Sequence, residues 1–295
     1  MGREVQLSLP AMPGLESVVN VTSVRHRSPF RYPGGKTWLV PRIRQWLASL
    51  SCRPREFIEP FAGGAIIGLT VAAENLVDHV TLVELDDRVA AVWRTIIEGD
   101  AAWLAARIGA FEVTPKSVED ALSQTDVPLR EKAFQTILLN RINRGGILAP
   151  GAGRLNYGEN GRGIRSRWYP QTLQKRILDI VKFRGRITFI EGDGLQVLTQ
   201  NAQRRDTAFL IDPPYTAGGK SSGSRLYRFS ELDHESLFEI TSTLSGDFLM
   251  TYASDPKVRR LARRHGFETR LVAMKGTHHR KMMELLVGRD LSWAR

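Results

Sequence analysis

Apolar residues follow two different periods along this chain, and the two periods alternate. Short runs rich in β-branched and aromatic residues predict strands at 57–61, 80–85, 187–192, 207–212, 247–253 and 280–288. Stretches with a helical period lie between them, at 65–75, 86–97, 233–244 and 256–266. Regular alternation of strands and helices at both ends of the chain predicts an α/β fold with a mostly parallel, doubly wound sheet.

The middle of the chain interrupts this alternation. Helical stretches at 130–143 and 169–183 flank a segment rich in glycine and arginine. We therefore expect residues 28–100 and 183–295 to form the sheet domain and residues 101–182 to form a helical, glycine-rich insert. Residues 1–27 show no clear period and contain two prolines, so they are expected to form an irregular arm.

Composition narrows the class of protein. Of the 295 residues, 42% are hydrophobic and 25% are charged, which is typical of a globular chain. No apolar run approaches the roughly 18 residues of a membrane span, and the first residues do not form a secretion signal. Cys52 is the only cysteine, and the six histidines lack metal-ligand spacing, so no metal is predicted and a reducing cytoplasm is the expected compartment.

The net charge of +11 indicates a polyanionic partner. The excess of basic residues lies in two stretches, 141–186 and 257–289, separated by acidic sequence. At 257–265 the arginines could equally well solvate a helix face. In the first stretch, six arginines lie among seven glycines, a composition that favours a loop able to adapt to phosphates: Arg141, Arg144, Arg154, Arg162, Arg165 and Arg167.

The segment Asp212-Pro213-Pro214-Tyr215 directly follows the apolar strand at 207–211. Ligands of open α/β sheets bind at the carboxyl ends of strands. The two prolines have no backbone N–H and fix their φ angles, so this turn offers carbonyl oxygens beside a carboxylate. Such a site suits an exocyclic amino group, whose two N–H donors could bind Asp212 and the Pro213 carbonyl while Tyr215 stacks on the ring.

Two glycine-containing turns accompany this motif. In FIEPFAGG, Gly63 and Gly64 lie between a strand and a helix, and Glu84 ends the next strand about 20 residues later, where an acidic side chain can meet ribose hydroxyls. Alternatively, Glu84, Asp86 or Asp87 could cap the following helix. The earlier turn, YPGGK at 32–36, lacks Walker A spacing, but Lys36 could reach a small ligand.

In the order YPGGK, EPFAGG, acidic strand end, basic insert and DPPY, the chain resembles DNA adenine methyltransferases of the Dam type over most of residues 28–288. The resemblance implies a Rossmann-like methyltransferase sheet, S-adenosylmethionine as cofactor, double-stranded DNA as partner, and residues 101–182 as the target-recognition insert. Such an enzyme acts alone or beside a cognate restriction or phage-defence subunit.

The resemblance also implies roles for individual residues. Cofactor contacts are expected from Tyr32, Pro33, Gly34, Lys36, Phe61, Gly63, Glu84, Asp193 and Asp212. Asp193 could instead cap the helix that follows it. Asn140 and Arg141 resemble the end of the family's helix that leads into its DNA-reading loop. The chain departs from the family's commoner pattern at Tyr32-Pro33, where Trp-Ala is more usual, and at Glu84-Leu85-Asp86, where an Asp-Ile-Asn type is more usual.

Residue types indicate direct transfer without a covalent nucleophile. Cys52 lies in no catalytic pattern, which argues against cytosine C5 chemistry. Asp212, rather than a serine, before Pro-Pro-Tyr favours adenine N6 over cytosine N4. RNA or cytosine N4 as substrate remains an alternative, as do a non-catalytic DNA-binding module and, given the absence of G-x-G-x-x-G, a less favoured nicotinamide dehydrogenase.

Overall fold

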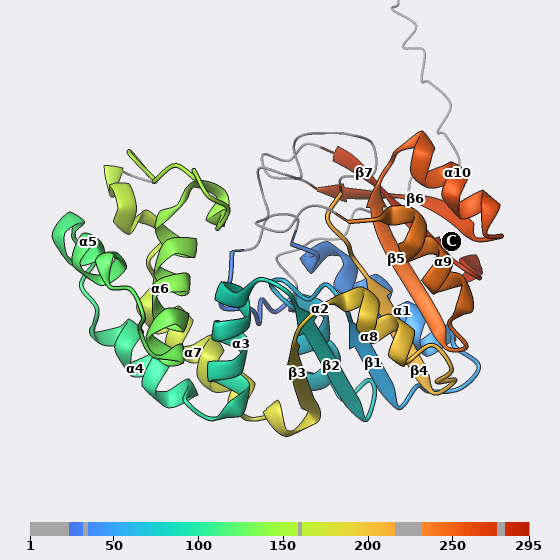
Figure 1. Cartoon of the computed structure of the whole chain (residues 1–295), viewed down its shortest axis with the longest axis horizontal. Helices are drawn as coiled ribbons and strands as arrows, with labels where there is room; N and C mark the ends of the chain where they lie inside the picture. Colours follow the sequence, from blue (N-terminus) through green and yellow to red (C-terminus); the bar gives the residue numbers. More distant parts are fainter. Residues whose placement is uncertain (1–23, 32–34, 159–160, 216–231, 276–280, 295) are drawn as a thin grey trace, which may run out of the picture.

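The computed structural model describes residues 24–31, 35–158, 161–215, 232–275 and 281–294. Its centre is a seven-stranded sheet in the order β3-β2-β1-β4-β5-β7-β6 (Figure 1). The strands are β1 (Glu56–Glu59), β2 (His79–Glu84), β3 (Ile187–Glu191), β4 (Thr207–Ile211), β5 (Asp247–Ala253), β6 (Glu268–Lys275) and β7 (Lys281–Gly288). The first five run parallel, and β7 pairs antiparallel with both β5 and β6. The expected doubly wound α/β sheet is confirmed.

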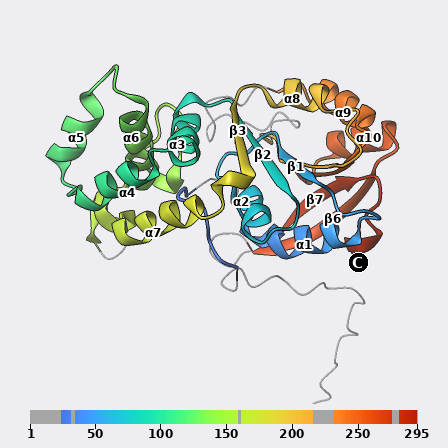
Figure 2. The same cartoon turned by 90° about the horizontal axis from the view of Figure 1, so that it is seen from below.

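Helices cover both faces of the sheet. On one face lie α1 (Val40–Ser49) and α2 (Ile66–Ala73), and on the other lie α8 (Gly194–Gln200), α9 (His234–Thr243) and α10 (Pro256–Arg264) (Figure 2). Two clusters of buried apolar side chains fill the two interfaces. β1 and β4 lie in the middle of the sheet with both faces covered, and all of their residues are buried. The sequence of β4, TAFLI, is therefore an almost continuous apolar run, whereas β1, EFIE, buries a glutamate at each end.

The insert lies beyond the β3 edge of the sheet (Figure 1). It contains α4 (Ala101–Ala110), α5 (Pro115–Ser123), α6 (Leu129–Ile142) and α7 (Pro170–Val181), and it packs on α3 (Asp87–Glu98) through α6. Trp93 of α3 belongs to the same apolar cluster as Leu104, Phe134 and Leu173 of the insert. The insert therefore shares a hydrophobic core with the sheet domain, and burial of this core fixes its position.

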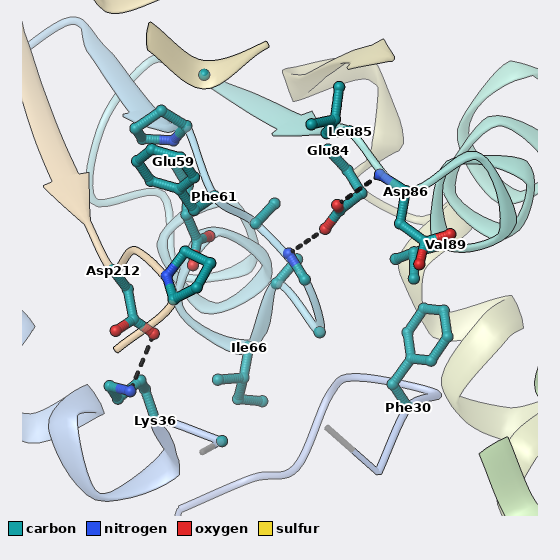
Figure 3. Close-up of a pocket in the computed structure, with 18 of the residues that line it drawn as sticks. Phe30, Lys36, Glu59, Phe61, Ile66, Glu84, Leu85, Asp86, Val89 and Asp212 are labelled. Atoms are coloured by element: carbon teal, nitrogen blue, oxygen red, sulfur yellow. Dashed lines mark hydrogen bonds and ion pairs between the residues drawn. The ribbon is translucent and has the colours of Figure 1, made fainter. Parts of the chain in front are cut away.

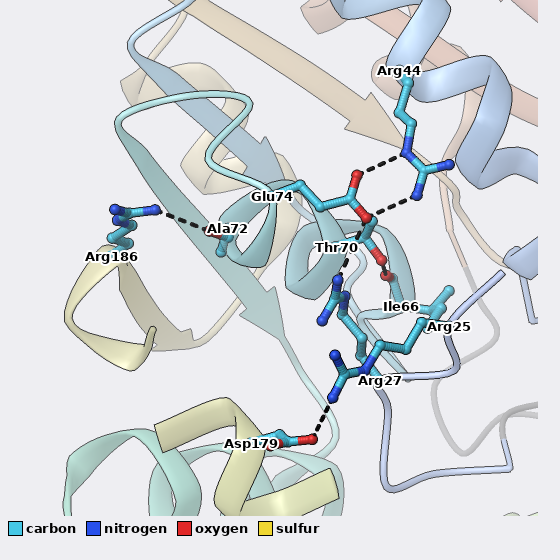
Figure 4. Close-up of polar contacts among 9 residues, drawn as sticks. All are labelled: Arg25, Arg27, Arg44, Ile66, Thr70, Ala72, Glu74, Asp179 and Arg186. Carbon is cyan, nitrogen blue, oxygen red and sulfur yellow. Dashed lines mark hydrogen bonds and ion pairs between the residues drawn. The ribbon is translucent and has the colours of Figure 1, made fainter. Parts of the chain in front are cut away.

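Residues 24–31 run without regular secondary structure between the insert and α2 (Figure 4). Arg25 pairs with Asp179 of α7 at 2.6 Å, and Arg27 lies 3.4 Å from Glu74 at the end of α2. Val24 is buried. The segment therefore packs on the folded body on both sides of the predicted boundary at residue 27.

One strand, β6, was not predicted. It pairs along its whole length with β7 at the edge of the sheet. Its sequence, ETRLVAMK, alternates only weakly between apolar and polar residues. Leu271 and Val272 are consecutive apolar residues on opposite faces, and Leu271 is exposed whereas Val272 is buried. Within the described residues, no helix combines the length and the apolar character that a bilayer span needs.

Candidate functional site

A pocket opens at the carboxyl ends of β1, β2 and β4, where the strand order reverses between β1 and β4 (Figure 3). Open α/β sheets bind ligands at this crevice. The cavity measures about 290 Å³, near the lower end of the roughly 300–1,000 Å³ of small-molecule sites. Its walls come from residues 60–66 after β1, 84–86 at the end of β2 and 193–195 at the start of α8. Asp212 and Pro214 after β4 also line it, as do His26, Ser28 and Phe30 of the segment 24–31.

Glu84 faces the glycine turn across this pocket (Figure 3). Its Oε2 accepts a hydrogen bond from the Gly63 amide at 2.9 Å, and its Oε1 accepts one from the Asp86 amide at 2.9 Å. Burial raises the pKa of Glu84 to about 7, against the opposing effect of the backbone hydrogen bonds. Each carboxylate oxygen has a further lone pair, so Glu84 can also accept hydrogen bonds from ligand hydroxyls.

Asp86 caps the N-terminus of α3, because its side chain accepts a hydrogen bond from the Arg88 amide. Glu84 is therefore not the cap, and its place in the pocket wall is consistent with the binding role expected for it. Asp193 fulfils the capping role that its sequence allowed, and the cofactor contact expected of it stays a prediction. It caps α8 by accepting from the Leu195 amide at 2.9 Å, and it also lines the pocket with an exposed side chain.

The turn after β1 is held by close packing around its glycines. Gly63 has φ +47°, a left-handed conformation that favours glycine. The Trp93 indole donates to the Gly63 carbonyl at 2.9 Å, and Phe30 packs on Trp93 with ring centroids 5.5 Å apart. Phe61 also lines the cavity. Long-range contacts therefore fix the backbone amide that faces Glu84.

Asp212 lies at the other end of the pocket, just past β4. Its Oδ2 is 2.9 Å from Lys36 Nζ (Figure 3), and its Oδ1 accepts from Thr251 Oγ1 at 2.6 Å and from the Tyr215 hydroxyl at 2.9 Å. Lys36 and Asp212, 176 positions apart in the chain, thus form an ion pair, and the cofactor contacts expected of both stay predictions. Pro214 also lines the pocket, whereas Pro213 is buried.

Tyr215 is packed inward. Its ring lies against Tyr252 of β5, with centroids 5.9 Å apart and planes at 25°, and Lys36 Nζ is 4.9 Å from the Tyr215 ring centroid. Burial raises the pKa of the Tyr215 hydroxyl well above 10, and Asp212 and Glu284 add to the effect. Tyr215 therefore acts as a neutral phenol.

Two buried acids of this site were missed from the sequence. Glu59 ends β1, its Oε2 accepts from the Gly68 amide at 2.9 Å, and burial raises its pKa to about 8. Glu284 of β7 contacts both Lys36 and Tyr215. The available signal was the same for both, an acidic residue flanked by apolar residues, as in FIEPF around Glu59 and MMELLV around Glu284. Tyr32, Pro33 and Gly34, predicted as cofactor contacts, lie outside the described residues.

Four predicted DNA-binding arginines are exposed on the insert: Arg144, Arg154, Arg162 and Arg165. Arg167 is half-buried. Tyr157, which lies on the same loop and was not predicted, is 85% exposed. An exposed aromatic ring beside arginines is a common feature of surfaces that bind nucleic acids.

The structure corrects the assignment of Asn140 and Arg141. Both are buried, at 0% and 4% exposure. The Asn140 amide group accepts from the Arg31 amide and donates to the carbonyls of Arg31 and Gly146, and Arg141 donates to the Pro29 carbonyl. Their hydrogen bonds join α6 to the segment 24–31, so neither side chain is available to DNA.

Two solved structures are similar over most of the chain. A protein from Pyrococcus horikoshii described as an RNA methyltransferase shares 11% identity, covers 88% of this chain and 84% of its own, and has a TM-score of 0.38. A precorrin-6y C5,15-methyltransferase from Geobacter metallireducens shares 10% identity, covers 84% and 85%, and has a TM-score of 0.35. Values this low carry no argument about this chain. Comparison with curated proteins gives no match.

A family model gives the decisive comparison. The model described as D12 class N6 adenine-specific DNA methyltransferase matches residues 32–275. Methyltransferases of this kind take the methyl group from S-adenosylmethionine, and the pocket fits that cofactor: Glu84 can accept from ribose hydroxyls, and the Gly63 turn lets the backbone approach closely. The chain is thus a methyltransferase, and it belongs to the D12 class N6 adenine-specific DNA methyltransferase family.

Proposed function

We propose that this protein transfers a methyl group from S-adenosylmethionine to the N6 amino group of an adenine in double-stranded DNA. The observation that carries the proposal is the position of Asp212. Its carboxylate, followed by two prolines, lies in the same pocket as Glu84 and the Gly63 turn. In this proposal, Asp212 would offer a hydrogen-bond acceptor to the amino group beside the bound cofactor.

The cofactor would lie along the carboxyl ends of β1 and β2. Glu84 would accept hydrogen bonds from the ribose hydroxyls, and Asp193 would accept one from the adenine amino group, while Phe61 would pack on the ring. When bound, S-adenosylmethionine supplies an electrophilic methyl group on a sulfonium. The chain's own residues then have to position the acceptor nitrogen and stabilise its charge.

Asp212 and the Pro213 carbonyl would hold the acceptor amine. The lone pair of an adenine N6 is delocalised into the ring, so it is a weak nucleophile. Hydrogen bonds from both N–H groups to these acceptors would favour a pyramidal nitrogen and fix its direction. Proximity and electrostatics would thus supply most of the rate.

The insert would bind the DNA around the target base. Extruding a base from a duplex costs a few kcal/mol. Contacts between the exposed insert arginines and phosphates would offset this cost. Asn140 and Arg141 would contribute indirectly, by holding the insert against the segment 24–31 that lines the pocket.

The test is transfer of labelled methyl from S-adenosylmethionine to unmethylated duplex DNA, with nucleoside analysis of the product. Labelled N6-methyladenine is expected from the wild type and from Asp206→Asn, and none from Asp212→Ala. Asp206 is a matched control because it flanks β4 at the opposite end and its side chain is 46% exposed. Cofactor binding without transfer to duplex DNA would overturn the proposal, and parallel reactions with RNA and single-stranded DNA would show which substrate replaces it.

A further inference from the structure

A buried glutamate on β7 completes the polar cluster around Asp212. Glu284 is 3% exposed. Its Oε1 lies 3.3 Å from Lys36 Nζ and is hydrogen bonded to the Tyr215 hydroxyl, while its Oε2 has no hydrogen-bond partner among the described residues. Asp212 contacts the same two groups. Lys36, Asp212, Tyr215 and Glu284 therefore form a closed ring of contacts.

This ring needs more protons than its hydroxyl groups can supply. The Thr251 hydroxyl uses its proton for Asp212 Oδ1, at 2.6 Å. The Tyr215 hydroxyl contacts both Asp212 Oδ1 and Glu284 Oε1, but a phenol carries a single proton. If both carboxyl groups were ionised, one Tyr215 contact would join two acceptors and would be repulsive. One of the two carboxyl groups must therefore carry a proton.

Three features assign that proton to Glu284 rather than Asp212. Lys36 Nζ is 2.9 Å from Asp212 and 3.3 Å from Glu284, so its charge favours an ionised Asp212. The side chain of Asp212 is 22% exposed, whereas that of Glu284 is 4% exposed. A buried ionised carboxylate with an unpartnered oxygen is costly, and a neutral acid reduces that cost.

We infer that Glu284 is a positioning residue for Asp212: it holds a proton, donates it to the Tyr215 phenol oxygen, and so directs the Tyr215 hydroxyl to Asp212. The inference rests on the proposed function, because Asp212 is the group that would hold the target amine. In this arrangement the ring is electrically neutral, since ionised Asp212 balances Lys36. Consecutive hydrogen bonds polarise one another, which strengthens the hold on Asp212.

The electrostatic surroundings of Glu284 agree with this role. Burial, the largest effect, raises the pKa of Glu284 and Asp212 raises it further, whereas Lys36 and the hydrogen bond with Tyr215 lower it. Among the described residues, Lys36 and Asp212 are the charged groups that face it, and Tyr215 is the other titratable one. Its neighbours on β5 and β6, Ala253 and Val272, carry no charge. Because the protonated form is lost as pH rises through this raised pKa, methyl transfer should decline on the alkaline side.

Single-turnover methyl transfer by four proteins tests the inference: wild type, Glu284→Gln, Glu284→Leu and Tyr215→Phe. Glutamine donates through its amide as the neutral acid does, so E284Q should stay within about threefold of wild type and lose the alkaline decline. E284L should be slower by about tenfold or more with little change in KM for either substrate. Because E284L and Y215F break the same chain of bonds, the double variant should be no slower than Y215F.

Opposite results would overturn it. If E284Q were as slow as E284L, a charged carboxylate would be required, and if both kept full rate and the alkaline decline, Glu284 would have no part in positioning. If E284L fails to fold, the pH profiles of wild type and E284Q alone decide between these outcomes.

A second readout separates this inference from the proposed function. The infrared difference spectrum between wild type and E284Q near neutral pH should contain the band of a protonated carboxyl group. This readout does not depend on which substrate the enzyme methylates. Absence of that band would refute a neutral Glu284 even if DNA is methylated. Its presence together with no transfer to DNA would leave Glu284 protonated and overturn only the proposed function.

Discussion

The pocket and the insert use charged side chains in opposite ways. Around the pocket, acids are buried or half-buried, and each is held by fixed partners at hydrogen-bond distance: Glu84 by two backbone amides, Glu59 by one, and Asp212 by Lys36. On the insert, arginines such as Arg144 and Arg165 are exposed and bond to backbone carbonyls. A buried charged side chain is held in one position by its partners, whereas an exposed one can rearrange to contact a polyanion.

Arg141 and Arg144 show that this difference follows burial rather than residue type. Three positions apart, one is 4% exposed and the other lies on the surface. Burial lowers the pKa of Arg141 to about 9, with help from Arg176 and Arg31. As with Glu59 and Glu84, burial therefore disfavours the charged form of Arg141, although the sequence places this residue at the start of the basic stretch.

The largest effect is expected at Asp212. Asp212→Asn should slow methyl transfer by roughly 10²–10⁴-fold, because an amide is a weaker acceptor and loses the ion pair with Lys36. Cofactor affinity should change far less, since Glu84 is untouched. Single-turnover rates and calorimetric cofactor binding measure the two quantities separately. Equal losses in both would mean that Asp212 mainly binds cofactor.

The two arginines give the next comparison. Arg141→Ala should reduce the free energy of unfolding by roughly 2–3 kcal/mol, because it leaves the buried Pro29 carbonyl without its donor. Arg144→Ala should change it by less than about 0.5 kcal/mol. Urea unfolding followed by circular dichroism measures both. Similar losses in the two variants would contradict the distinction by burial.

Glu84 should make cofactor affinity depend on pH. Its pKa is raised to about 7, and the ionised form is the better acceptor, so affinity should rise with pH and be about tenfold weaker at pH 6 than at pH 8. Glu84→Gln should bind weakly at both pH values. Glu191→Gln is the matched control, because Glu191 of β3 is the strand partner of Glu84 but its side chain is exposed. A pH dependence that survives in E84Q would assign it to another group.

The smallest effect is expected from single exposed arginines. Arg162→Gln should lower DNA affinity only severalfold, while the slope of log affinity against log salt should fall by about 0.9 for each phosphate that the side chain no longer neutralises. Arg53→Gln, an exposed arginine whose side chain pairs with Asp78 in the sheet domain, should leave the slope unchanged. Fluorescence anisotropy at several salt concentrations measures both. An unchanged slope for R162Q would place the DNA away from this loop.

The local sequence determined most of the fold and the positions of two acids that line the pocket, Glu84 and Asp212. Strands at the positions of β1, β2 and β4 were predicted from short runs of mostly apolar residues followed by turn residues, because buried side chains leave a clear signal. Glu84 ends β2, and Asp212 directly follows β4. Parallel strands bring their carboxyl ends to one edge, so the order of elements along the chain was enough to place Glu84 and Asp212 together. β6 was missed because an edge strand with an exposed face carries a weak pattern.

Only the tertiary structure decided which charges are buried. Asn140 and Arg141 carry no sequence feature that separates them from Arg144, and their burial arises from residues 28–31 packing across α6. Glu284 meets Lys36 and Tyr215 only because β7 enters the sheet beside β5. The physical reason is that burial and partner choice depend on contacts between distant segments, which a local pattern of residue types does not encode.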